Sequence, residues 1–398
     1  MSLKLSEKAQ AVKPSSTLAI TAKAKAMKAE GIDVVGFGAG EPDFNTPENV
    51  CNAAIAAIQS GFTKYTPASG TEELKQAISR KFKEFNHLDY AVNQIVISNG
   101  GKHALSNIFE AILNPGDEVI IPAPYWLSYP EMVKLSDGIP VFVFASKEQN
   151  YKATAAQIEA AITPETKALV LNSPSNPTGM IYTEEELRAI ADVVVKHDIY
   201  VVADEMYEYL IYGNEKHISI ASLNDEIYKR TITCSGLSKS YSMTGWRIGY
   251  TGSSAEIAKL MSSIQSHATS NANSIAQKAA VEALNGPQDT VEAMKTEFNK
   301  RRKYMFERIS KMPCLSAIEP KGAFYMFIDA SEVLSKEYKG EKIGTVSRLA
   351  DILLTDYAVA IVPCADFGFP ENFRLSYAIS IEQIEKGLDR IETCLKSL

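Results

Sequence analysis

The chain has 398 residues, of which 45% are hydrophobic and 22% charged, and its formal net charge is -7 at pH 7. This composition predicts a globular protein with enough residues for a large core and more than one domain. Acidic and basic residues are interspersed, so no nucleic-acid partner is predicted, and no apolar stretch reaches the length of a membrane span.

Five scattered cysteines form no CxxC pair, which predicts reduced thiols rather than a disulfide framework or a zinc site. The five histidines are also scattered, and we expect no metal centre. Residues 1–10 lack the apolar core of a signal peptide. Together these features predict a cytoplasmic protein.

Between about residues 50 and 285, short apolar runs alternate with stretches of helical periodicity. The seven runs are Ile95–Ser98, Glu118–Pro122, Pro140–Phe144, Ala168–Asn172, Tyr200–Ala203, Thr231–Cys234 and Arg247–Tyr250. Apolar strands separated by helices predict a mostly parallel sheet covered on both faces. The intervening helices are expected near Thr71–Glu84, Lys102–Leu113, Thr183–His197 and Ala255–Gln265. Thr183 followed by Glu186 predicts a capping box at the start of the third helix.

A charged helical stretch follows near Thr290–Met312, and its run Arg301–Lys303 is expected on a solvated helix face. The remaining residues mix strands and helices, which predicts a second, smaller α+β domain. The segments that carry this pattern are Gly322–Asp329, Val346–Tyr357, Val359–Pro363, Phe373–Tyr377 and a helix from about Ile381. We therefore expect an N-terminal segment (1–45) joining the small domain, a large domain (46–287), and an interdomain helix with the small domain (288–398).

Ligands of open α/β sheets bind beyond the carboxyl ends of the strands, so the residues after each run are candidates. Asn99–His103 opens a helix with two glycines, which suits a phosphate but equally a plain turn. Trp126 could stack on a flat ring or belong to the core. Asn176 lies in a rigid polar loop, where it could donate to a phenolic oxygen or simply form the turn.

Asp204 follows a buried strand, where an unpaired carboxylate would be costly. It could face a pyridinium N–H group or cap the next helix, and Tyr207 lies one helical turn further on. In the alternating segment Phe373–Tyr377, Arg374 could recognise a carboxylate or form a surface ion pair.

Lys239 lies just after the strand Thr231–Cys234 and eight residues before Arg247. A lysine whose pKa is lowered by burial or by nearby positive charge can form an imine with an aldehyde, and an arginine can bind a phosphate through two hydrogen bonds. Aldehyde and phosphate are the two handles of pyridoxal 5'-phosphate (PLP). Considered alone, Lys239 would be a solvated surface lysine.

In their order along the chain, these segments resemble the PLP-dependent class I aminotransferases of fold type I, the aspartate aminotransferase family. The segment Gly236–Gly249 fits the lysine attachment pattern throughout; further matches are Gly40–Phe44, Lys64–Tyr65, Asn176–Gly179, Asp204–Tyr207 and Arg374. The resemblance covers almost the whole chain. It implies a mostly parallel seven-stranded sheet between helices, a smaller α+β domain, and a homodimer with active sites at the subunit interface.

The resemblance implies the roles of the cofactor-binding residues. Lys239 corresponds to the catalytic lysine that holds PLP, Asp204 to the partner of the ring nitrogen, and Trp126 to the stacking ring. Residues implied around the phosphate and the phenolic oxygen are Gly101, Lys102, Arg247, Tyr207, Asn176 and, from a neighbouring subunit, Tyr65. Gly236 departs from the family, because many members have a serine there that touches the phosphate; Ser235 or Ser238 is expected to replace it.

The resemblance also implies transfer of amino groups between small amino acids and 2-keto acids. Residues implied for substrate binding are Arg374 for the α-carboxylate, with Gly40, Trp126, Asn176, Lys102 and Thr17. No arginine occurs between Arg247 and Arg301, where one branch of the family carries its second carboxylate-binding arginine. Lys102 and the segment Lys13–Thr17 instead resemble a bacterial subgroup in which such a lysine and threonine handle dicarboxylates.

We therefore expect a ping-pong transamination that converts L-aspartate and 2-oxoglutarate into oxaloacetate and L-glutamate. Two alternatives stay open. One is an aromatic or prephenate aminotransferase, and the other is a PLP-dependent β-lyase on the same scaffold.

Overall fold

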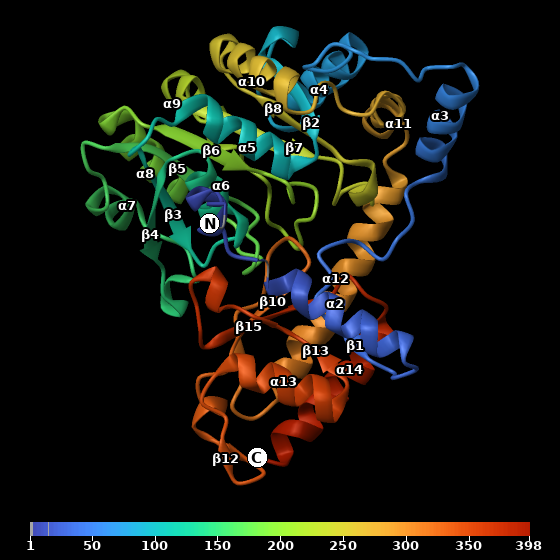
Figure 1. Cartoon of the computed structure of the whole chain (residues 1–398), viewed down its shortest axis with the longest axis vertical. Helices are drawn as coiled ribbons and strands as arrows, with labels where there is room; N and C mark the ends of the chain where they lie inside the picture. Colours follow the sequence, from blue (N-terminus) through green and yellow to red (C-terminus); the bar gives the residue numbers. More distant parts are fainter. Residues whose placement is uncertain (1–2, 15) are drawn as a thin grey trace.

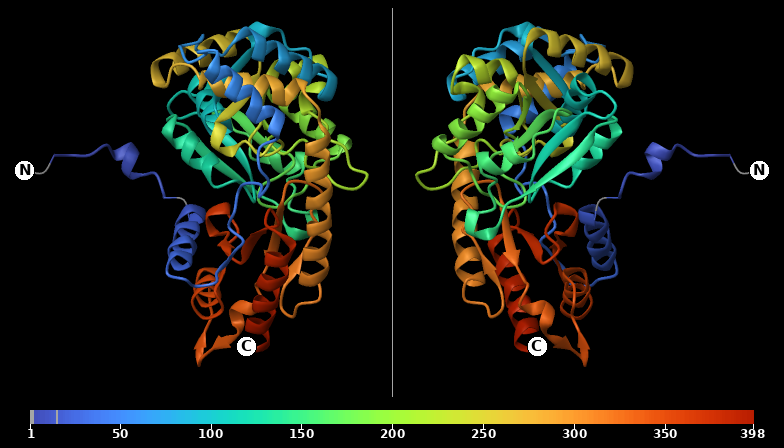
Figure 2. Two further views of the ribbon diagram at one scale, coloured as in Figure 1. Left: turned by 90° about the vertical axis from the view of Figure 1, so that its right-hand side faces the viewer. Right: turned by 90° about the vertical axis from the view of Figure 1, so that its left-hand side faces the viewer.

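The computed structural model describes residues 3–14 and 16–398. A larger body built around one sheet lies above a smaller body, and the long helix α12 (Asp289–Ile309) runs between them (Figure 1). Residues 3–14 project to one side of the molecule (Figure 2). Ser15, part of the N-terminal motif noted above, lies outside the described residues.

The larger body contains a seven-stranded sheet in the order β2-β8-β7-β6-β5-β3-β4. Strand β8 is antiparallel to both of its neighbours, and the remaining neighbours pair in parallel. The prediction of an α/β fold with a mostly parallel seven-stranded sheet is thus confirmed. The strands are β2 (Ile95–Asn99), β3 (Glu118–Ala123), β4 (Ile139–Phe144), β5 (Thr166–Asn172), β6 (Tyr200–Asp204), β7 (Thr231–Gly236) and β8 (Ile248–Gly252).

Helices cover both faces of the sheet, and successive residues of each strand point to opposite faces. One face packs against α5 (Gly101–Ile112), α6 (Ser128–Leu135) and α10 (Ala255–Ala268). The other packs against α4 (Glu72–Phe85), α7 (Ala155–Ala160), α8 (Glu184–His197), α9 (Asp225–Arg230) and α11 (Ser274–Asn285), and α3 (Glu48–Gln59) lies against α11. In β6, Val202 faces the first set, whereas Val201 and Ala203 face the second.

The edge strand β4 departs from the expectation of full cover. Ile139 and Phe144 are about half exposed, at 48% and 56%. An edge strand has a neighbouring strand on one side only, and α6 covers β4 only in part.

Local sequence signals set the helix ends. Thr183 accepts a hydrogen bond from the backbone N–H of Glu186, whose carboxylate accepts one from the N–H of Thr183, so α8 begins with the predicted capping box. Helix α5 begins at Gly101 behind Gly100, which has φ +86°, a conformation that suits glycine.

The smaller body contains a four-stranded antiparallel sheet in the order β14-β15-β10-β9, packed against α12 and two further helices. The strands are β9 (Ser316–Ala317), β10 (Tyr325–Asp329), β14 (Val362–Pro363) and β15 (Asn372–Ser376), and the helices are α13 (Val346–Tyr357) and α14 (Ile381–Lys396). Strands β11 (Glu337–Tyr338) and β12 (Glu341–Lys342) form a separate hairpin.

The N-terminal residues contribute to this smaller body. Strand β1 (Val35–Gly36) pairs with β13 (Val359–Ala360), and α2 (Ser16–Ala29) packs against both strands, whereas the short α1 (Glu7–Gln10) lies against α6. The division at residues 45/46 and 287/288 stays a prediction. Within the described ranges, no helix has the length and apolar character to cross a membrane.

The expectation of a solvated face for the charge run on α12 is wrong for two of its three residues. Arg301 and Arg302 are buried, and only Lys303 is exposed. Arg301 forms ion pairs with Asp43 and Glu297 at 2.8 and 2.9 Å. Arg302 pairs with Glu319 and donates to the carbonyl of Pro320. Because α12 packs between distant segments, these arginines meet acceptors that the local pattern does not reveal.

Candidate active site

A cavity of about 410 Å³ lies at the carboxyl ends of the parallel strands, a size typical of small-molecule sites. All but one of the predicted site residues line this cavity. The predicted residues that line it are Thr17, Gly40, Gly101, Lys102, Trp126, Asn176, Asp204, Tyr207, Ser238, Lys239, Arg247 and Arg374. The exception, Tyr65, does not line it and is 89% exposed.

Lys239 lies in the loop after β7, with its amino group at the cavity. Nζ donates a hydrogen bond to the carbonyl oxygen of Gly40 at 2.5 Å. Burial lowers the pKa of Lys239 to about 8, with further lowering by Arg247 and Arg374 against an opposing effect of Glu41. A lysine with this pKa is partly neutral near pH 7 and can act as a nucleophile or base.

Arg247 and the start of α5 form an anion-binding corner of the cavity. Arg247 precedes β8 with φ 58° and donates to the carbonyl oxygens of Thr244 and Asn99 at 2.8 and 3.3 Å. Its guanidinium fills the space over Gly100, where a Cβ atom would come within 2.2 Å of Nη2. The N-terminus of α5 and this guanidinium together suit a phosphate group.

The structure separates the two serines that could replace the missing one. Ser238 lines the cavity, whereas Ser235 donates to the carboxylate of Glu208 on the other side of β7. A Cβ atom at Gly236 would lie 2.9 Å from the carbonyl oxygen of Ile248, so a side chain there would require a backbone shift. Close packing thus accounts for the glycine, and only Ser238 reaches the cavity.

Asp204 ends β6 on the face that packs against α6. Its Oδ2 accepts a hydrogen bond from the hydroxyl of Tyr129 at 2.5 Å, and its Oδ1 accepts one from the backbone N–H of Met206 at 3.1 Å. Burial raises the pKa of Asp204, although both hydrogen bonds oppose this effect. Within the described part of the chain, Asp204 forms no salt bridge, so a cationic ligand group would provide the compensation that a buried carboxylate needs.

Arg374 on β15 is a residue of the smaller body that lines the cavity. Its Nη1 donates to Oδ1 of Asn176 at 2.8 Å, and its guanidinium carbon lies 4.2 Å from the centre of the Tyr325 ring. Its Nε is buried without a hydrogen-bond partner among the described residues. Because an unpaired buried N–H group is unfavourable, this side chain favours an anionic ligand such as a carboxylate.

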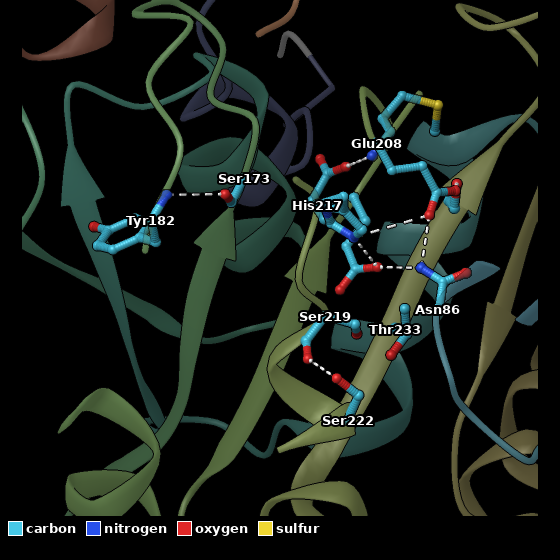
Figure 3. Close-up of polar contacts among 12 residues, drawn as sticks. Asn86, Ser173, Tyr182, Glu208, His217, Ser219, Ser222 and Thr233 are labelled. Carbon is cyan, nitrogen blue, oxygen red and sulfur yellow. Dashed lines mark hydrogen bonds and ion pairs between the residues drawn. The ribbon is translucent and has the colours of Figure 1, made fainter. Parts of the chain in front are cut away.

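The loop that carries Asn176 is fixed at its start by a hydrogen bond from the N–H of Tyr182 to Ser173 Oγ at 3.3 Å (Figure 3). Across the cavity, the hydroxyls of Tyr207 and Tyr325 lie 2.9 Å apart. The hydroxyl of Tyr207 is therefore held at the cavity wall by one hydrogen bond and can form a second one to a ligand.

Lys102 and Thr17 provide a second polar region in the cavity. Lys102 Nζ lies 5.0 Å from the centre of the Trp126 ring, and desolvation followed by the charge of Arg247 lowers the pKa of Lys102. No carboxylate pairs with Lys102 within residues 3–14 and 16–398. The buried Oγ1 of Thr17 likewise has no hydrogen-bond partner there.

Sequence reasoning missed Tyr129 and Tyr325, which both line the cavity. Tyr325 lies in an apolar run, and Tyr129 lies on a helix that was not predicted. The available signal was weak: a tyrosine in place of phenylalanine in a buried segment carries a hydroxyl that needs a partner.

On the opposite side of β6 lies a second set of buried polar residues, the inner cluster: Lys81, Asn86, Glu205, Glu208 and His217. Figure 3 shows Asn86, Glu208 and His217 converging from three segments. Lys81 forms an ion pair with Glu208, and Asn86 Nδ2 donates to Glu205 and Glu208 at 3.0 and 2.7 Å. His217 Nε2 lies 2.8 Å from Glu205 Oε2.

Glu205, Glu208 and His217 lie close enough to resemble a metal-ligand set. However, Lys81 and Asn86 already direct N–H groups at the carboxylate oxygens that an ion would need. The charges of the inner cluster are therefore compensated within the cluster, although His217 Nδ1 has no hydrogen-bond partner among the described residues.

Comparison with known proteins adds a family to this geometry. The family model described as aminotransferase class I and II matches residues 32–391. An aspartate aminotransferase of Bacillus sp. (strain YM-2) is 50% identical over 98% of this chain and 99% of that protein. A probable aspartate/prephenate aminotransferase of Rhizobium leguminosarum is 49% identical over 96% of each. The crystal structure of the aspartate aminotransferase from Rhizobium meliloti superposes with a TM-score of 0.96 and 42% identity over 100% of both chains.

Proposed function

This chain belongs to the family of class I and II aminotransferases, and from that premise we propose that it transfers the amino group of L-aspartate to 2-oxoglutarate, with PLP as its cofactor. The observation that carries the proposal is the cavity that combines Lys239, whose pKa is lowered to about 8, with the buried Asp204 and Arg374. The names of the relatives support the choice of aspartate.

The residues present fit PLP. Gly100 leaves room for Arg247 beside the N-terminus of α5, which suits the phosphate. The buried carboxylate of Asp204 lacks a cationic partner, which a protonated ring nitrogen would provide. Trp126 borders the same cavity and can stack on the ring, and Lys239 can reach the aldehyde. We assign the phosphate to Arg247, Gly101 and Ser238, with Lys102 nearby, and the phenolic oxygen to Tyr207 and Asn176.

When bound, PLP supplies an aldehyde that accepts the amino group and a ring that withdraws electrons from the reacting carbon. Arg374 holds the α-carboxylate of the substrate and so orients the Cα–H bond, with Asn176 fixing Nη1. Lys239 Nζ takes the proton from Cα and acts as the general base. Asp204 holds the proton on the ring nitrogen. After the first keto acid leaves, the same residues act on the second in reverse order, which makes the reaction ping-pong.

Lys102 and Thr17 support a substrate with a second carboxylate. Arg374 serves one carboxylate, and the cavity offers a further cation and an unpaired hydroxyl, together with Gly40 at its wall. Aspartate and 2-oxoglutarate both have two carboxylates. Use of prephenate is the second candidate, because a relative 49% identical to this chain is named a probable aspartate/prephenate aminotransferase.

We further propose a cytoplasmic homodimer with shared active sites. The support for the dimer is Tyr65, a large aromatic side chain that is 89% exposed and lies on a loop before α4. In a dimer, Tyr65 would reach the phosphate site of the partner subunit.

Reduction with borohydride tests the cofactor and its attachment. In the holoprotein, peptide mapping should find the phosphopyridoxyl group on Lys239 alone. The Lys239→Ala variant should lose turnover by about 10²-fold or more, because the general base is removed. Label on a different lysine, or turnover in Lys239→Ala close to wild type, would refute the assignment.

Substrate choice is tested at Lys102. Lys102→Ala should lower kcat/KM for aspartate about 10- to 100-fold, the size expected for a lost hydrogen bond to a charged group, and should change alanine use much less. Lys259→Ala, an exposed lysine on α10, is the control. Equal losses for the two amino acids would contradict recognition of the second carboxylate, and a panel of keto acids that includes prephenate would separate the two candidates.

A further inference from the structure

The hydrogen bond between Tyr129 and Asp204 joins two fully buried groups at the floor of the cavity. Tyr129 is 1% exposed and Asp204 is 5% exposed. The distance of 2.5 Å is at the short end for an O–H donor to a carboxylate, as charge-assisted hydrogen bonds are. Burial and the neighbouring carboxylate raise the pKa of Tyr129 well above its ordinary value, so its hydroxyl remains a donor.

The rigid surroundings of Tyr129 fix the direction of this donor. Tyr129 belongs to the core that α5, α6 and α10 share with the sheet. Its ring packs edge-on against Trp126, three residues earlier, with ring centres 5.4 Å apart and planes at 89°. One short segment thus carries both the ring that borders the cavity and the donor to Asp204.

The two oxygens of Asp204 have different environments. Oδ1 accepts from the backbone N–H of Met206, and Oδ2 accepts from Tyr129. Each oxygen has a second lone-pair direction, and Asp204 lines the cavity. Without the hydroxyl of Tyr129, a buried carboxylate has one donor fewer and binds a proton more readily.

We propose that Tyr129 is a positioning residue, whose hydroxyl keeps Asp204 ionised and oriented so that the proton shared with the cofactor stays on the ring nitrogen. This inference rests on the proposed function. It assigns to a phenol on α6 the control of how strongly the cofactor ring withdraws electrons, because only a protonated ring nitrogen does so effectively.

The test compares wild type, Tyr129→Phe and the matched control Tyr90→Phe. Tyr90 is also buried and contacts a side-chain hydroxyl, that of Thr233 at 3.1 Å, but it lies on the other face of the sheet, away from the cavity. Each holoprotein is loaded with PLP labelled with ¹⁵N at the ring nitrogen, whose NMR shift reports protonation directly. Retained PLP after dialysis, kcat and KM are measured alongside.

In Tyr129→Phe the nitrogen signal should move toward the unprotonated shift, and kcat should fall about tenfold with KM changed less than about twofold, the effect of one charge-assisted hydrogen bond. PLP should also dissociate more readily. Tyr90→Phe should retain the wild-type nitrogen shift, even if its free energy of unfolding falls by as much as that of Tyr129→Phe. An unchanged nitrogen shift in Tyr129→Phe would overturn the inference.

Site-specific incorporation of 3-fluorotyrosine at position 129 provides a variant that keeps the shape and the donor. Its more acidic phenol should preserve the protonated nitrogen and a kcat within about twofold of wild type. A nitrogen shift equal to that of Tyr129→Phe would assign the effect to packing and overturn the inference. A wild-type protein that binds no PLP would refute the proposed function itself. So would PLP-loaded wild type in which borohydride reduction leaves no phosphopyridoxyl group on Lys239.

Discussion

Asp204 and Glu205 are neighbours in the chain, yet they belong to charged sites of opposite character. Asp204 faces the cavity with Lys239, Arg247 and Arg374. Glu205 belongs to the inner cluster, in which Lys81, Asn86 and His217 lie beside the two glutamates. The alternation of side chains along β6 produces this difference, because residues 202 and 204 share one face, whereas 203 and 205 share the other.

Burial does not distinguish these two sites, since both acidic residues are almost fully buried. The difference lies in the hydrogen-bonding and charge capacity that the chain leaves unused. Both oxygens of Glu208 accept from side chains within the inner cluster. In the cavity, Arg374 Nε and Thr17 Oγ1 have no partner within the described ranges. The inner cluster also has one such atom, His217 Nδ1, but its carboxylates face Lys81 and Asn86, whereas Asp204 forms no salt bridge among the described residues. A ligand site is therefore recognised by a buried charge without a counter-charge, rather than by burial alone.

The largest expected effect tests whether the inner cluster is structural. Lys81→Met should lower the free energy of unfolding by about 3–5 kcal/mol, because it leaves Glu208 buried without its cation. Urea unfolding measures the change. Lys83→Met, on the same helix but in an exposed pair with Asp89, should cost less than about 1 kcal/mol. Similar values for the two variants would show that the buried Lys81–Glu208 pair contributes no more to stability than the exposed pair does.

The next comparison neutralises each of the two adjacent acids in turn. Asp204→Asn should lower kcat about 10²- to 10³-fold, because the preorganised charge that holds the ring nitrogen proton is lost. The free energy of unfolding of its apoprotein should not fall, because a buried charge that forms no salt bridge within the described ranges is removed. Glu205→Gln should show the reverse pattern, with stability reduced and kcat nearly unchanged. Two variants with the same profile would show that the sites are not separate.

The charge state of Lys239 gives a smaller, graded effect. With a pKa of about 8, its neutral fraction should rise about tenfold between pH 7 and pH 9, with the midpoint at about 8. Reductive methylation of the apoprotein with formaldehyde, followed by peptide mapping, measures the rate at Lys239. Exposed lysines in the same digest provide the reference, since an ordinary lysine titrates near about 10.4. A rate at Lys239 that follows the reference would contradict the lowered pKa.

The smallest effect concerns pH and the inner cluster. Although burial opposes it, Glu205 and Glu208 raise the pKa of His217 above its ordinary value of 6.5. The stabilisation by protonated His217 is therefore fully present below pH 6.5 and is lost as pH rises through the raised pKa. Wild type should lose about 1–2 kcal/mol over this range relative to His217→Gln. His267→Gln, at an exposed site on α10, should keep the wild-type slope.

The sequence predicted the parts of the fold that depend on local patterns. Seven apolar runs correspond to the seven strands, and the predicted capping box at Thr183 begins α8. The charge run on α12 was misjudged, because Arg301 and Arg302 find partners at Asp43 and Glu319, which are distant in sequence or set by packing. A local pattern contains no information about such acceptors.

The candidate site was predictable where a residue type has few ordinary structural uses at its position. Asp204 and Arg374 end or occupy strands, at which an unpaired charge requires an explanation. Lys239 considered alone would be a surface lysine, and it was recognised through the resemblance of its segment to the family's attachment pattern. Tyr129 and Tyr325 were missed because a buried tyrosine fits an apolar pattern as well as phenylalanine does. Their hydroxyl partners, Asp204 and Tyr207, become apparent only when the elements are assembled.

At position 247, folding and ligand binding favour different residues. The left-handed backbone of Arg247 suits glycine and costs an arginine about 1–2 kcal/mol. Glycine at this position would remove the conformational cost, but it would also remove the guanidinium that donates to Thr244 and Asn99 and faces the proposed phosphate site. In a thermostability screen, this codon needs to be held constant.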